Sequence, residues 1–99
     1  MDNDNELLED AAGAVNGGCW HPLTHTILWR PLADDGDAFR LAVHLRLEID
    51  ICRTGVAVRT PDGLKVLVSS DDEKDAATAT RRAIVRAAAA MRRAAVGAA

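Results

Sequence analysis

The stretch that decides the fold is DDGDAFRLAVHLRLEIDIC, residues 34–52, because two hydrophobic periodicities meet in it. Its first half carries apolar residues at helical spacing, namely Ala38, Leu41, Ala42 and Leu45. Apolar residues also alternate with polar ones from residue 41 to residue 51, so a strand fits as well as a helix up to Leu45. Beyond Leu45 only the strand pattern fits. We therefore predict a helix over 35–45 followed by a strand over 46–52.

Three aspartates mark the start of this helix. Asp34 stands three residues before Asp37, which approximates a capping box, and Asp35 adds a further carboxylate near the positive end of the helix dipole. The same cluster could bind a divalent cation, since carboxylates are the usual ligands of such ions. Capping of the helix is the simpler interpretation.

The remaining elements follow from caps, turns and alternation. Asn5 can cap a first helix, and Pro61 and Gly63 suit a turn. The expected segments are an acidic tail over 1–5, a helix over 6–15, a loop or short edge strand over 16–33, a turn at Thr54–Gly55, strands over 56–59 and 64–69, and a turn at Thr60–Gly63.

The last predicted helix is rich in alanine, the best helix former. Ser70 and Glu73 fit a capping box for a helix over 73–95, and Gly97 ends it. One face is expected to be apolar, formed by Ala77, Ile84, Ala88, Met91 and Ala95. The opposite face carries a stripe of Arg82, Arg86 and Arg93.

Together these elements predict an α+β fold in which helices flank a three-stranded antiparallel meander, in the order α-α-β-β-β-α. A chain of 99 residues is expected to form a single domain over 1–99, with its core in 34–95. A core of small aliphatic side chains gives modest stability, which is compatible with a homodimer. The acidic N-terminus lacks the features of a signal peptide, and no apolar run suits a membrane span. The two cysteines then indicate free thiols in the cytoplasm.

Two stretches carry a family resemblance. WRPLADDGDAFRLAV, residues 29–43, has a Trp-x-Pro motif before the acidic helix start, and ATATRRAIVRAAA, residues 77–89, is similar to a closing helix of the same group. Over about residues 29–95 the chain resembles the phage ABA sandwich domain family and its uncharacterised relatives. The resemblance implies a bacteriophage or prophage origin and an α-β-α style of fold. It implies no activity and no catalytic residues. For a phage protein, the expected location is the cytoplasm of the host cell.

The sequence offers little catalytic or cofactor chemistry. Cys19, His21 and His25 lie within seven residues, but a structural zinc site usually takes four ligands in paired sets. No Gly-rich phosphate loop is present, and Ser69 and Ser70 suit capping better than nucleophilic catalysis. We therefore predict a protein that is not an enzyme and that holds no metal or cofactor.

Charge is distributed unevenly along the chain. Residues 1–50 carry 10 acidic and 3 basic groups, whereas residues 51–99 carry 5 acidic and 9 basic groups. Three interpretations fit: the arginine stripe contacts phosphates, the acidic half docks on a basic surface of another protein, or the two halves attract each other within the fold. The acidic start of the last helix opposes binding to a nucleic-acid backbone.

The favoured hypothesis is a non-enzymatic phage protein that binds a host protein or defence complex, for example as an anti-CRISPR-like inhibitor that occludes a functional surface. The alternative is a small nucleic-acid-binding or regulatory module that uses the arginine stripe. Trp29 could contact a partner, or it could be buried in the core, since tryptophan is usually well buried. The candidate partner-binding residues are Asp34, Asp35, Asp37, Trp20, His25, Arg82, Arg86 and Arg93.

Overall fold

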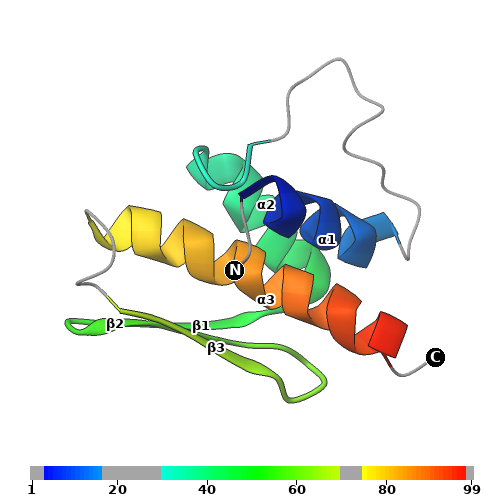
Figure 1. Ribbon diagram of the computed structural model, residues 1–99. Coiled ribbons are helices and arrows are strands. Elements are labelled where there is room, and N and C mark those ends of the chain that lie inside the picture. The colour runs from blue at the N-terminus through cyan, green and yellow to red at the C-terminus, as the bar shows by residue number, and fades with distance from the viewer. Residues whose placement is uncertain (1–3, 17–29, 70–74, 98–99) are drawn as a thin grey trace.

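The computed structural model describes residues 4–16, 30–69 and 75–97, which form three helices and a three-stranded sheet (Figure 1). Along the chain the elements are α1 (Asp4–Asn16), α2 (Asp35–Leu45), β1 (Glu48–Cys52), β2 (Gly55–Arg59), β3 (Lys65–Ser69) and α3 (Ala76–Gly97). This order confirms the predicted α+β fold class. The first helix extends past both ends of its predicted range of 6–15.

The three strands form an antiparallel meander in the order β1-β2-β3, as predicted. The predicted turn joins β2 to β3, and the N–H of Gly63 donates to the carbonyl oxygen of Thr60 at 3.0 Å. Gly63 has a φ of +96°, which glycine adopts without the steric cost of a Cβ atom. The turn predicted at Thr60–Gly63 is therefore formed by those residues.

The strands β2 and β3 correspond to the predictions at 56–59 and 64–69, with each start shifted by one residue. The turn before β2 lies at Arg53–Thr54 rather than at Thr54–Gly55. Gly55 already belongs to the sheet, where a Cβ atom would collide with the carbonyl oxygen of Val68. The close approach of β3 therefore explains the glycine.

Helix α2 has the predicted bounds, but the strand after it starts at Glu48 rather than at residue 46. Arg46 adopts the left-handed conformation, with a φ of +56°. The N–H groups of Arg46 and Leu47 donate to the carbonyl oxygens of Val43 and Ala42, at 3.2 and 3.0 Å. These bonds form the Schellman motif that ends a helix, so both residues belong to the C-terminal cap that follows α2 and not to the strand.

Helix α3 also begins later than predicted, at Ala76 rather than at residue 73. Asp75 caps it, because one of its carboxylate oxygens accepts the N–H of Thr78 at 2.7 Å. Hydrogen bonds from Thr78 hold the pKa of Asp75 below its usual value. The predicted capping pair, Ser70 and Glu73, lies outside the described residues.

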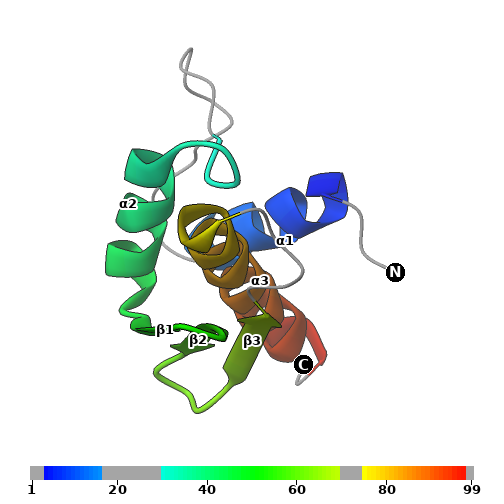
Figure 2. The same cartoon turned by 90° about the vertical axis from the view of Figure 1, so that its left-hand side faces the viewer.

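Helix α3 lies between the sheet and the other two helices (Figures 1 and 2). Of the predicted apolar face, Ile84 and Ala88 are buried and Met91 is half-buried, but Ala77 and Ala95 are exposed. The side chains that are buried surround most of the helix: Ala79, Ala83, Ile84, Val85, Ala87, Ala88 and Ala89. Neighbours pack against several sides of α3 because a methyl group lets them approach its axis closely.

The other elements each bring an apolar set to this helix. Helix α1 contributes Leu7 and Ala11, and the sheet contributes Val56, Val58 and Val68. Helix α2 contributes the predicted stripe, which is buried as expected: Ala38, Leu41, Ala42 and Leu45. The core is therefore a layer of small and medium aliphatic side chains around α3.

Ala88→Leu is expected to lower the free energy of unfolding by about 1–3 kcal/mol, because extra methylene groups overpack a filled core. Ala88 has no exposed surface. Ala95→Leu is the matched control on the same predicted face, and its exposed site should change stability by less than about 0.5 kcal/mol. Urea unfolding followed by circular dichroism measures both, and equal effects would contradict the observed placement of α3.

Candidate functional site

One strand of the sheet, β1, is poorly covered by the helices. Ile49 and Ile51 project from the same face as Val58 and Val56, their partners on β2, because paired residues of antiparallel strands point to one side. Val58 and Val56 are 0% and 3% exposed, whereas Ile49 and Ile51 are 38% and 58% exposed. Helix α3 packs mainly on β2 and β3 and barely reaches β1. The apolar face of β1 therefore borders solvent.

Helix α2 also presents apolar side chains away from the core. Phe39 and Val43 are 67% and 59% exposed. They are four residues apart, so they lie on one face of the helix, next to the buried stripe. The helix thus has a second apolar surface in addition to the one that packs against α3.

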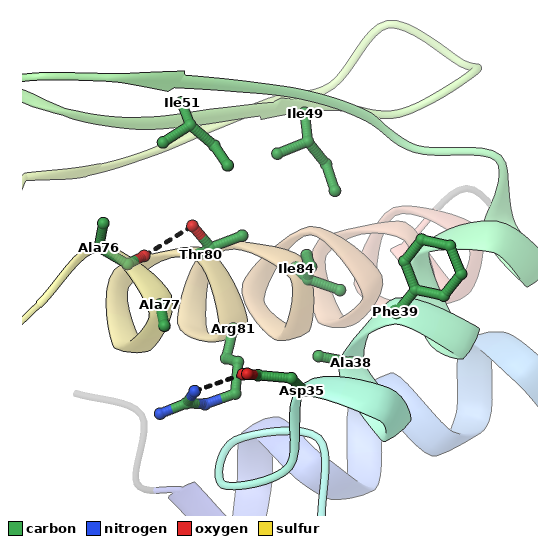
Figure 3. Close-up of a pocket in the computed structure, with 10 residues that line it drawn as sticks. All are labelled: Asp35, Ala38, Phe39, Ile49, Ile51, Ala76, Ala77, Thr80, Arg81 and Ile84. Atoms are coloured by element: carbon green, nitrogen blue, oxygen red, sulfur yellow. Dashed lines mark hydrogen bonds and ion pairs between the residues drawn. The ribbon is translucent and has the colours of Figure 1, made fainter.

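Helices α2 and α3 and strand β1 enclose a groove of about 490 Å³, here named the α2–β1 groove (Figure 3). Ile49 and Ile51 point from β1 towards α3, and Phe39 closes one end (Figure 3). Thr80 also lines the groove, but its hydroxyl donates to the carbonyl oxygen of Ala76 at 2.7 Å. The walls are mainly methyl and aromatic surface: Ala38, Phe39, Ile49, Ile51, Ala77 and Ile84.

Arg81 joins the N-terminal end of α2 to α3 beside the groove. Its Nε donates to the carbonyl oxygen of Leu32 at 3.0 Å, and its Nη2 donates to Oγ1 of Thr78 at 3.1 Å. Its Nη1 forms an ion pair with Oδ1 of Asp35 at 2.6 Å. Asp35 is 78% exposed, so solvent screens the ion pair, and the bond to the carbonyl is the better shielded restraint.

The other two aspartates of the predicted acidic cluster are engaged locally. Asp34 is the N-cap of α2 and accepts the N–H of Asp37 at 2.7 Å, which confirms the capping interpretation. Asp37 accepts the N–H of Arg30 at 2.9 Å and the guanidinium of Arg40 at 2.7 Å. Burial would raise the pKa of Asp37, but these bonds outweigh it and leave the pKa below its usual value. Asp37 therefore adds stability above its unfolded pKa, and that contribution is lost as the pH falls through its folded pKa.

The three arginines of the predicted stripe have different environments. The Nε of Arg93 donates to Oδ2 of Asp10 on α1 at 2.7 Å, Arg82 is half-buried, and Arg86 is exposed. The Arg93–Asp10 pair and the Arg81–Asp35 pair each join the acidic half of the chain to the basic half. For these pairs the structure supports attraction between the two halves within the fold.

Several sequence candidates, Cys19, Trp20, His21, His25 and Trp29, lie outside the described residues. Within residues 4–16, 30–69 and 75–97, no three His, Cys, Asp or Glu side chains gather as a metal site requires. No helix in the same ranges is both long and apolar enough to span a membrane.

Cys52, at the end of β1, is a free and exposed thiol. Its Sγ donates to Oδ1 of Asp50 at 3.6 Å. The negative charge of Asp50 raises the pKa of the Cys52 thiol, with the hydrogen bond adding to the effect. The thiol is therefore less nucleophilic than an unperturbed cysteine, because the thiolate is the reactive form.

No family model, curated protein or solved structure matches this chain. The resemblance to the phage ABA sandwich family, and the phage origin that it implies, therefore stay predictions from the sequence. The α2–β1 groove is therefore identified as a candidate site from its geometry alone.

Phe39, Val43, Ile49 and Ile51 were not singled out as site residues from the sequence. A signal for the first two was present, since they form an i, i+4 apolar pair outside the main stripe of α2. The two isoleucines carried no such signal, because alternation alone predicts a buried face.

Arg81→Met is expected to lower the free energy of unfolding by about 1–3 kcal/mol, because the carbonyl oxygen of Leu32 loses its partner. Asp35→Asn is the matched control, since it removes the charge of the exposed ion pair and keeps Arg81, and it should cost less than about 1 kcal/mol. Urea unfolding measures both variants. An equal loss in the two would mean that the ion pair, and not the carbonyl bond, holds α2 against α3.

Asp50→Asn is expected to lower the pKa of the Cys52 thiol, because it removes the charge that raises that pKa. In a Cys19→Ser background, alkylation of Cys52 by iodoacetamide at pH 8 should then be faster. Glu48→Gln removes a charge from the same strand and is the matched control. An unchanged rate in Asp50→Asn, or an equal rise in Glu48→Gln, would count against a local effect of Asp50.

Proposed function

We propose that this chain is a non-enzymatic protein-binding module whose α2–β1 groove receives an apolar segment of a partner protein. The observation that carries the proposal is the groove itself. Three large apolar side chains, each between 38% and 67% exposed, line it: Phe39, Ile49 and Ile51. Val43, which is 59% exposed, lies one helical turn from Phe39 on the same face of α2. Contiguous apolar surface of this kind marks interaction sites in proteins.

An isolated apolar residue elsewhere on the molecule provides a comparison. Leu67 on β3 is 68% exposed, as much as Phe39, but it pairs with Ala57 on the opposite face of the sheet from Val56 and Val58. Single exposed apolar residues are common on protein surfaces and need no functional explanation. The concentration of such residues around one groove supports a function there.

The walls of the groove belong to rigid elements. Phe39 lies on a helix that is capped by Asp34 and tied to α3 by Arg81. Ile49 and Ile51 lie on a strand paired along its length with β2. A rigid surface binds with a small loss of conformational entropy, and an aromatic side chain at such a surface is a common centre of binding energy.

The sequence hypothesis of a host partner, and of an anti-CRISPR-like role in blocking host defence, is a narrower form of this proposal. It rests on sequence patterns and on the acidic half of the chain. The nucleic-acid alternative has less support, because Arg93 already donates to Asp10 within the chain.

Phe39→Asp and Ile51→Asp are expected to weaken peptide binding at least tenfold, because each places a charge where the partner needs an apolar contact. The probe is a set of fluorescent peptides, 16 residues long, enriched from a random display library on the wild-type protein. Fluorescence anisotropy gives the dissociation constants. Leu67→Asp, at an equally exposed leucine on the other face of the sheet, should change them less than twofold.

Circular dichroism must show that all three variants are folded. The proposal fails if the library yields no binding peptide. It also fails if the enriched peptides bind Phe39→Asp and Ile51→Asp as tightly as they bind the wild-type protein.

A further inference from the structure

Strand β1 is an edge of the sheet. The order β1-β2-β3 leaves one side of β1 without a neighbouring strand among the described residues. In an antiparallel pair every second residue directs its N–H and C=O groups away from its partner strand. The five residues of β1 therefore present backbone donors and acceptors along the edge, where another extended chain could pair with them.

This edge borders the α2–β1 groove. Helix α2 stands on the β1 side of the sheet, away from β3 (Figure 2). Ile49 and Ile51 point from β1 into the groove, and Phe39 faces the same space (Figure 3). A strand added to β1 would continue the pleat of the sheet, so every second side chain of that strand would stand beside these isoleucines. The added strand would therefore contact both the backbone edge of β1 and the apolar groove.

The other face of β1 is acidic. Glu48 and Asp50 alternate with the two isoleucines. Arg59 of β2 stands opposite Glu48, but the residue opposite Asp50 is Ala57. Arg59 and Lys65 line the same pocket as Glu48 and Asp50 on the side of β1 that faces β2. On the other side of β1, basic side chains of an added strand would stand directly opposite these two carboxylates and complement them.

The same charges oppose two registers of pairing with a second copy of the chain. Antiparallel pairing of two β1 strands centred on Asp50 would place Asp50 opposite Asp50 of the second copy. Pairing centred on Ile49 would place Glu48 opposite Asp50 of the second copy. Like charges directly opposite each other destabilise a sheet.

We propose that the partner segment binds as an extended strand on the free edge of β1, with apolar residues towards the groove and basic residues alternating with them. This assignment rests on the function proposed above and names the chemistry of the segment. In this assignment the acidic half of the chain recognises the segment through Asp50 and the neighbouring Glu48, rather than through the aspartates at the start of α2.

The test uses three capped seven-residue peptides: alternating lysine and valine, alternating glutamate and valine, and lysines and valines grouped in blocks. Fluorescence anisotropy with the full chain measures their dissociation constants. The alternating lysine–valine peptide should bind at least tenfold more tightly than the other two. Asp50→Lys should remove this advantage and favour the glutamate–valine peptide, whereas Asp62→Lys, the same charge change in the exposed β2–β3 turn, should not.

Backbone pairing is tested by N-methylation of the lysine–valine peptide. Methylation of one alternate set of amides, the set that faces β1, should weaken binding at least tenfold, and methylation of the other set should weaken it much less. Amide hydrogen exchange of β1 should slow on binding, with no matching change in β3. Equal effects of the two methylation patterns would overturn the strand assignment.

The remaining outcomes separate this inference from the proposed function. Peptide affinity that depends on Phe39 but not on Asp50 or on N-methylation would refute the strand assignment and leave the groove as a binding site. Peptide binding that is indifferent to Phe39 would refute both. A dimer in sedimentation that Phe39→Asp dissociates would show that a second copy fills the groove, which also overturns the inference.

Discussion

Close packing around α3 is the constraint on which the rest of the structure depends. Each of the other described elements contacts this helix, and its buried surface consists largely of alanine. Small side chains allow the sheet on one side and α1 and α2 on the other to approach its axis. A larger residue at a buried position such as Ala88 would have to push one of these layers away. The alanine content, which raises helix propensity, therefore also sets the spacing of the layers.

The groove is a consequence of the same packing. One helix covers β2 and β3 but is too narrow to cover β1 as well, so Ile49 and Ile51 lose the neighbours that bury Val58 and Val56. Helix α2 does not cover these isoleucines either, because its cap and the bond from Arg81 to the carbonyl oxygen of Leu32 hold its start beside α3. The space between α2 and β1 stays open and apolar, next to a strand edge that no other described strand pairs with.

The charged residues divide between structural and surface roles. Asp34 and Asp37 act in the start of α2, and Asp35 and Asp10 pair with arginines of α3. These carboxylates are held by neighbours in the fold, which limits what they offer to a partner. The acidic residues of β1 are placed differently, on a strand edge, and this difference makes them the better candidates for recognition.

The local elements could be predicted from the sequence because their causes are local. The N-cap Asp34, the turn ending in Gly63 and the alternation of residues 47–51 depend on near neighbours, and they determined the element order and the fold class. Burial depends on which surfaces meet, and the sequence could not supply that. Only the tertiary structure decided that Ala79 is buried while Ala95 is exposed, that Arg93 bonds to Asp10, and that the apolar face of β1 borders an open groove. The physical reason is that periodicity specifies the direction of a side chain, whereas exposure is set by elements distant in the chain.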